Sequence, residues 1–85
     1  MANYRIEVKR SAAQEIAALQ KRECQRVVAR LQALAAEPRP PGCEKLTGDD
    51  KYRVRQGDYR ILYEIDDESR TVTIVKFRNR KEVYR

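Results

Sequence analysis

Histidine is absent from the 85 residues of this sequence, and cysteine occurs only twice. Cys24 and Cys43 form no C-x-x-C pair and have no histidine with which to complete a zinc site, so we expect no metal and no cofactor. We interpret Cys24 as a small buried hydrophobic residue on the apolar face of a helix and Cys43 as a reduced thiol in a loop. The absence of histidine also excludes the histidine pair that often supplies a general acid and a general base.

Long apolar runs are missing as well. No segment approaches the ~20 apolar residues of a membrane-spanning helix, and the first residues, Met1 to Ile6, lack the apolar core of a signal peptide. Internal repeats and low-complexity tracts are also absent from the sequence. A chain this short has room for one hydrophobic core. We therefore expect a single domain over residues 1–85, a cytoplasmic location without a membrane, and a shallow site open to solvent.

Positive charge, in contrast, is abundant. Nineteen Lys and Arg residues stand against thirteen Asp and Glu, which gives a formal net charge of +6. Excess positive charge supplies affinity for phosphate groups irrespective of base sequence and speeds association with polyanions. The composition therefore favours a nucleic acid as partner, and it suits an acidic protein segment equally well.

The first half of the chain predicts one strand and two helices. Residues 4–8 alternate between apolar and charged, as in a half-buried strand, and Ser11 and Gln14 have the spacing of a capping box at the start of a short helix. A second helix has apolar residues Cys24, Val27, Val28, Leu31 and Leu34, and its expected solvent side carries Arg22, Arg26, Arg30 and Gln32. The prolines of residues 38–41 end it. We expect a helical hairpin that packs on a sheet.

The second half predicts three strands, over residues 52–56, 59–66 and 71–77. Gly57-Asp58 and residues 66–69 supply the turns. A strand, two helices and then a three-strand antiparallel meander are typical of an α+β fold, with the helices on one face of a four-stranded sheet. The chain ends, over residues 79–84, in a short turn or helix that needs docking to be stable.

The hairpin around Gly57-Asp58 places positive charges opposite each other. A two- or four-residue loop pairs Arg55 with Arg60, and Arg53 joins them on the same face of the sheet. Like charges directly opposite each other destabilise a sheet, so a purely structural sequence gains little from this arrangement, and a bound anion relieves the repulsion. The alternative interpretation is a plain solvated sheet face.

A second basic cluster follows at the end of the neighbouring strand and contains Arg78, Arg80, Lys81 and Arg85, with Tyr84 among them. Guanidinium groups bind phosphate oxygens in a forked geometry and a tyrosine ring can stack on a base, so the pattern favours RNA. Arginine can stabilise the charge that develops during RNA cleavage, but its high pKa makes it a poor general base. The remaining candidates for that base are Tyr84, Lys45, Lys51, Lys76, Lys81, Glu44 and Glu64.

Three stretches resemble the RelE branch of the RelE/ParE toxin superfamily: Leu46 to Gly48, Tyr52 to Asp67, and Arg78 to Arg85. The order and length of the elements fit over the whole chain, although only residues 46–85 are specific. The resemblance implies a toxin of a type II toxin–antitoxin pair. Such a toxin acts as a metal-independent endoribonuclease in the ribosomal A site, where the ribose 2′-OH of the messenger RNA attacks the scissile phosphate and leaves a 2′,3′-cyclic phosphate.

The same resemblance assigns roles to residues. It implies catalytic roles for Arg55, Arg60, Arg78 and Tyr84. We further expect RNA binding by Lys45, Arg53, Arg80 and Lys81. In this scheme Arg60 holds the scissile phosphate, Arg78 stabilises it or protonates the leaving group, and Tyr84 stacks on or orients the base. Two positions depart from the family pattern, because Arg55 stands where relatives often have a lysine base and Asn79 where many have a histidine. The general base therefore stays unassigned.

The implied partners are the ribosome with its messenger RNA and a short helical antitoxin whose acidic segment suits the positive charge of the chain. Operator DNA is expected only through the antitoxin complex. Two alternatives stay open. One is a ParE-like inhibitor of DNA gyrase, since that branch shares the scaffold and the signature from Gly57 to Asp66. The other is a catalytically weak relative that only binds, which the departures at Arg55 and Asn79 keep possible.

Overall fold

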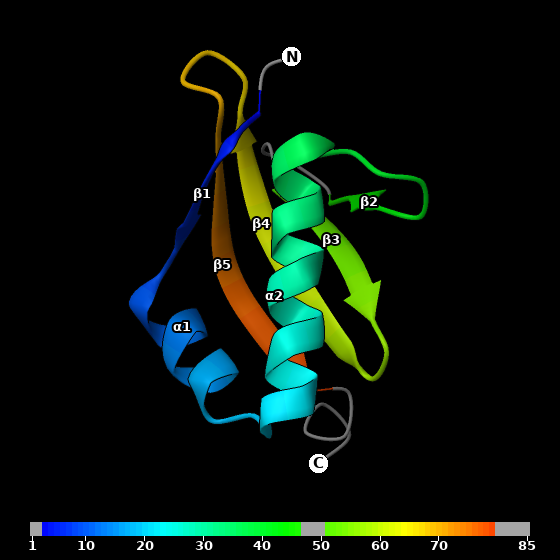
Figure 1. Cartoon of the computed structure of the whole chain (residues 1–85). Helices are drawn as coiled ribbons and strands as arrows, with labels where there is room; N and C mark the ends of the chain where they lie inside the picture. The colour runs from blue at the N-terminus through cyan, green and yellow to red at the C-terminus, as the bar shows by residue number, and fades with distance from the viewer. Residues whose placement is uncertain (1–2, 47–50, 80–85) are drawn as a thin grey trace.

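The computed structural model describes residues 3–46 and 51–79. Its elements are β1 (Arg5–Val8), α1 (Arg10–Ala17), α2 (Lys21–Ala36), β2 (Glu44–Lys45), β3 (Lys51–Gln56), β4 (Tyr59–Asp66) and β5 (Thr71–Asn79). The strands form one sheet in the order β1-β5-β4-β3-β2, in which β1 runs parallel to β5 and the other neighbours are antiparallel. Both helices lie on one side of this sheet, with α2 across its middle (Figure 1). The predicted α+β architecture is confirmed.

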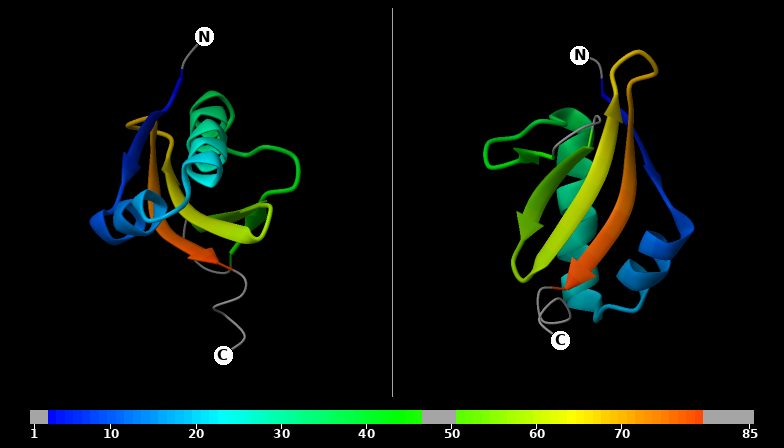
Figure 2. Two further views of the ribbon diagram at one scale, coloured as in Figure 1. Left: turned by 60° about the horizontal axis from the view of Figure 1, so that its bottom comes forward. Right: turned by 180° about the vertical axis from the view of Figure 1, so that it is seen from behind.

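The opposite side of the sheet carries no described helix, as the view from behind shows (Figure 2). We call this side the open face. Because no described helix covers the open face, a ligand can reach the outward side chains of β3, β4 and β5 there.

None of the described helices has the length and apolar character that crossing a membrane requires.

The hydrophobic core fills the space between the helices and the sheet. Its buried residues are Ala12, Ile16, Val27, Leu31, Leu34, Tyr52, Val54, Ile61, Tyr63, Ile65, Val72, Ile74 and Phe77. Alternate residues of a strand point to opposite faces, so burying Val54 and Ile61 turns their chain neighbours toward the open face. The core thus decides which side chains the open face presents.

A fifth strand, β2, corrects the prediction of a four-stranded sheet. It has two residues, with Glu44 opposite Arg53 and Lys45 opposite Tyr52. Two residues are too few to show an alternating pattern, so the sequence does not reveal this strand. Because β2 is short, it covers only part of the edge of β3 (Figure 1).

Two predictions about the helices are wrong. α1 begins at Arg10 after Lys9, without a side-chain cap, so Ser11 lies inside the helix and the capping box does not form. The reason is that the Lys9 N–H donates to the Ile74 carbonyl (2.9 Å), which keeps the chain beside β5 until the helix starts. On α2, Arg30 is half-buried instead of facing solvent, and Val28 is 41% exposed instead of joining the core.

The loop after α2 is fastened to one end of the sheet. The Arg39 guanidinium donates to Asp67 (3.0 Å) and to the Tyr52 hydroxyl (3.1 Å), and Tyr4 donates to the same Asp67 carboxylate (2.6 Å). The hydrogen bonds from Arg39 and Tyr4 hold the pKa of Asp67 below its ordinary value. Asp67 follows the end of β4, whereas Arg60 lies near its start, about 20 Å away along an extended strand. These contacts therefore lie at the end of the sheet that is far from Arg60.

Candidate nucleic-acid interface

Three arginines lie side by side across the open face. Arg55 on β3 is directly opposite Arg60 on β4, and Arg60 is directly opposite Arg78 on β5. Strands in a sheet are about 4.8 Å apart, so the three side chains start within about 10 Å of one another. We call this set the arginine row. Arg55 and Arg78 are exposed and Arg60 is half-buried.

The turn between β3 and β4 fixes the first of these pairings. Gly57 and Asp58 form a two-residue turn, and Gly57 has a φ of +61°, a left-handed conformation that glycine adopts without strain. The predicted pairing of Arg55 with Arg60 and of Val54 with Ile61 is confirmed. Local turn chemistry therefore determines which face the arginines occupy.

A β-bulge fixes the second pairing. Leu62 pairs with Lys76, but the next residue of β4, Tyr63, pairs with Ile74, so Val75 is an extra residue on β5. One extra residue reverses the alternation, and for this reason both Ile74 and Phe77 are buried although they are three positions apart. The reversal turns Lys76 and Arg78 to the open face. Arg78 joins the arginine row because of this bulge.

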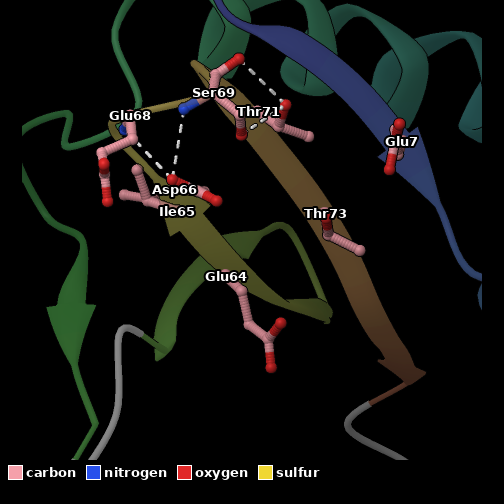
Figure 3. Close-up of a pocket in the computed structure, with 8 residues that line it drawn as sticks. All are labelled: Glu7, Glu64, Ile65, Asp66, Glu68, Ser69, Thr71 and Thr73. Carbon is pink, nitrogen blue, oxygen red and sulfur yellow. Dashed lines mark hydrogen bonds between the residues drawn. The ribbon is translucent and has the colours of Figure 1, made fainter.

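The other end of the open face is acidic. A shallow pocket of about 780 Å³ is lined by Glu7, Glu64, Ile65, Asp66, Glu68, Ser69, Thr71 and Thr73 (Figure 3). The Asp66 carboxylate accepts hydrogen bonds from the backbone N–H groups of Glu68 (3.0 Å) and Ser69 (3.2 Å), which shapes the turn into β5. Within the described ranges, no three such side chains are grouped closely enough to hold a metal ion. The carboxylates repel a polyanion and restrict it to the end that carries the arginine row.

Sequence comparison with known families gives a match over residues 6–84, to the ParE toxin of the type II toxin–antitoxin system parDE. The chain belongs to the RelE/ParE superfamily of type II toxins. The fold of this toxin is similar to that of RelE in the archaeal RelE–RelB complex from Pyrococcus horikoshii OT3, with a TM-score of 0.83 and 31% identity over 92% of this chain and 96% of that chain.

Two mycobacterial proteins are similar to this toxin as well. The RelBE2 toxin–antitoxin complex of Mycobacterium tuberculosis matches with a TM-score of 0.82 and 30% identity, over 94% of each chain. Toxin RelG of the same species is 47% identical over 34 residues, which are 40% of this chain and 39% of RelG. The resemblance to RelE that the sequence motifs indicated is therefore confirmed over nearly the whole chain by structure and over a shorter segment by sequence.

The structure also places Arg53, a predicted RNA-binding residue of the toxin. It lies two residues before Arg55 on β3, on the same face as the arginine row and opposite Leu62 on β4. Its guanidinium donates twice to one oxygen of Glu44, at 2.7 Å and 3.0 Å. This contact, with smaller contributions from Arg55 and Arg60, holds the pKa of the Glu44 carboxyl below its usual value. In the described part of the toxin Arg55, Arg60 and Arg78 form no such ion pair.

The candidate general bases also differ in whether the structure brings them close to the arginine row. Lys76 lies on the open face beside the arginine row, opposite Leu62 and two residues before Arg78. Lys45 pairs with Tyr52, whose side chain is on the helix side, so the structure does not bring Lys45 to the row. Lys51 and Glu64 pair with each other farther along the sheet.

Three predicted site residues, Arg80, Lys81 and Tyr84, lie outside the described residues, and their roles stay predictions.

Arg30 is the residue near this site that the sequence pattern did not single out. Its Nε is buried without a hydrogen-bond partner in the part of the chain that the structure describes. A signal was present, because Arg30 follows Val27 by three positions and precedes Leu34 by four, the spacing of one helix face. Its side chain lines a cavity together with Arg55.

Proposed function

We propose that this toxin is an endoribonuclease that cleaves messenger RNA in the ribosomal A site. The proposal rests on the arginine row, in which Arg60 lies directly opposite Arg55 on one side and Arg78 on the other, all on the open face. Such pairs are unfavourable within a sheet, and a phosphate group relieves the repulsion. Similarity to proteins that bear the RelE name supports the same class of activity.

In the proposed reaction the ribose 2′-oxygen attacks the adjacent phosphorus, and the bond from phosphorus to the 5′-oxygen breaks. Negative charge builds up on the two non-bridging oxygens as the phosphorane forms. Arg60 stands in the middle of the arginine row and holds those oxygens, while Arg55 and Arg78 stabilise the added charge from either side. The products are a 2′,3′-cyclic phosphate and a 5′-hydroxyl group.

Two protons must also move in this reaction. The attacking 2′-OH gives up a proton and the leaving 5′-oxygen gains one. Arginine is a poor base, so another group is needed. Of the candidate bases in the described part of the chain, Lys76 lies on the same face as the arginine row and next to it. We therefore place Lys76 in the role of base, and we place Tyr84 in the role that the family resemblance implies, stacking on the substrate base.

In this proposal the ribosome holds the RNA strand in the reactive geometry, which the open face alone does not do. An open sheet has no walls to fix the RNA strand in a reactive geometry, and positioning is a large part of the rate of such a reaction. We therefore propose that the toxin acts in the cytoplasm on ribosome-bound message. We propose further that a cognate antitoxin inhibits it by laying an acidic helical segment on the arginine row, and that operator DNA is bound only by that complex.

The decisive experiment adds purified toxin to a translating extract and maps the message ends by primer extension. Cuts with codon periodicity are expected for the native toxin and for Arg22→Ala, which removes an exposed arginine from α2. Arg60→Ala and Tyr84→Ala are expected to abolish the cuts. Intact message in every reaction would contradict the proposal.

The ParE description of the matching family favours one alternative, inhibition of DNA gyrase. The same protein preparation is therefore tested in a supercoiling assay. Inhibited supercoiling together with intact message would assign the toxin to that activity. If the toxin shows neither effect, the remaining interpretation is a relative that only binds its partners.

A further inference from the structure

A cavity opens at the edge of β3, around the corner from the arginine row. It has a volume of about 400 Å³ and is lined by Arg30, Gly42, Glu44, Val54 and Arg55. Because β2 pairs only with Tyr52 and Arg53, no described strand covers the edge of β3 beyond that point (Figure 1). The cavity therefore connects the helix side, from which Arg30 reaches in, with the open face, where Arg55 ends the arginine row.

The Arg30 guanidinium is the first reason to expect an anion here. Its Nε is buried and has no acceptor among the described residues. A buried donor on a charged group is strongly unfavourable without a partner, and nearly all such groups in folded proteins have one. Turning the Arg30 guanidinium into the cavity that this residue lines exposes the donor, and a phosphate oxygen there supplies the missing acceptor.

Glu44 is the lining residue that opposes an anion, and Arg53 offsets its charge. The Glu44 carboxylate is the acidic group in the lining, and Arg53 already binds one of its oxygens at 2.7 Å. Gly42 has a φ of +92°, and apart from Gly42 and its two chain neighbours no described residue has an atom within 4 Å of the place where a Cβ would stand. The backbone at Gly42 can therefore be approached closely from the cavity.

We propose that this cavity binds a phosphate group of the RNA strand next to the scissile phosphate, held between Arg30 and Arg55. The proposal rests on the function proposed above, because the arginine row defines the direction of the strand. Arg78, Arg60 and Arg55 follow one another across β5, β4 and β3, and the cavity that Arg55 shares with Arg30 adjoins the last of them. Arg30 is a binding residue that positions the strand, with no part in the chemical step.

Nuclear magnetic resonance of the full-length toxin, titrated with inorganic phosphate, tests the site without RNA. The Nε–H resonances of Arg30 and Arg55 and the amide resonance of Gly42 are expected to shift and saturate together. The Nε–H resonance of Arg22, exposed on the same helix, serves as the control. If the Arg30 resonance does not move, or moves without saturation as that of Arg22 does, the cavity is not an anion site. The measurement needs no variant, so misfolding cannot obscure it.

Binding of a fluorescent single-stranded RNA at several salt concentrations then tests the occupant. Removing one phosphate contact lowers the slope of log affinity against log salt by about 0.7 for a single strand. We expect that loss in Arg30→Gln, a smaller effect in Arg30→Lys, and the native slope in Arg22→Gln. In the translating extract Arg30→Gln should cut at the native positions with lower efficiency.

The outcomes separate this inference from the proposed function. If Arg60→Ala abolishes cleavage while Arg30→Gln binds RNA as Arg22→Gln does, the inference is wrong and the proposed function stands. If phosphate shifts Arg30 but no variant changes RNA binding or cleavage, the anion site stands while RNA as its occupant and the proposed function are wrong. A glutamate-rich peptide that displaces phosphate from the cavity where RNA does not would likewise overturn RNA as the occupant.

Discussion

Arg60 and Arg78 stand directly opposite each other on β4 and β5, and neither is paired with a carboxylate in the described part of the chain. Arg55 repeats the arrangement on the other side of Arg60. The sheet therefore stores electrostatic repulsion at the place where a phosphate is to bind. Removing one of these charges should therefore raise the stability of the fold and lower the activity, and both quantities can be measured.

Arg60→Gln is predicted to stabilise the fold and to disable the toxin. The substitution removes a charge that faces like charges on both sides, so the free energy of unfolding should rise by about 0.2–1 kcal/mol in low salt. Cleavage of ribosome-bound message should fall about 100-fold or more, because the charge on the phosphorane loses its central partner. Urea denaturation and primer extension give the two quantities. A variant that is both less stable and fully active would contradict the assignment.

Deletion of Val75 is predicted to remove the bulge and to keep the arginine row. Ile74 and Phe77 are then two positions apart, so a regular strand buries both and leaves Lys76 and Arg78 on the open face. We expect a folded chain by circular dichroism that still cleaves ribosome-bound message. Val75→Ala keeps the residue count, and with it the bulge, and serves as the matched control. Loss of folding or cleavage in the deletion variant alone would contradict this account of β5.

Lys76 can be tested as the base by comparing two substitutions. Lys76→Arg keeps the positive charge beside the arginine row but offers no group that accepts a proton near neutral pH. If Lys76 removes the 2′-OH proton, Lys76→Arg and Lys76→Ala should both lose cleavage by about 100-fold or more, with RNA binding retained in the arginine variant. If Lys76 only attracts phosphate, the arginine variant should cleave normally. Single-turnover cleavage on programmed ribosomes separates the two cases.

Local rules predicted much of this site. The Gly57-Asp58 turn and the alternation of β3 and β4 predict that Arg55 and Arg60 are opposite each other, and the structure confirms it. The bulge at Val75 could not be foreseen in the same way, because one unpaired residue depends on how Ile74 and Phe77 fit the core. The burial of Arg30 could not be predicted for a related reason. Charge suggests a solvent-facing residue, whereas Arg30 is half-buried because it lies on the same face of α2 as the buried Val27 and Leu34.

The stability of the fold is predicted to decline in alkaline solution because of Tyr63. Its buried hydroxyl donates to the Pro38 carbonyl (2.8 Å), and burial raises the pKa of Tyr63 above its ordinary value of 10.0. Above pH 10 the unfolded chain ionises this tyrosine while the folded chain keeps it neutral. The stabilisation is therefore complete below pH 10 and is lost as the pH rises further.

Tyr63→Phe tests this account. It removes the hydrogen bond to Pro38, so the free energy of unfolding at pH 7 should fall by about 1 kcal/mol. Stability should then decline less between pH 9 and pH 11 than in the native toxin, since one fewer buried hydroxyl resists ionisation. Tyr59→Phe is the comparison variant, because burial and the nearby Glu23 carboxylate also raise the pKa of that tyrosine. Parallel curves for native toxin and Tyr63→Phe, measured by urea denaturation at each pH, would rule out Tyr63 as the source.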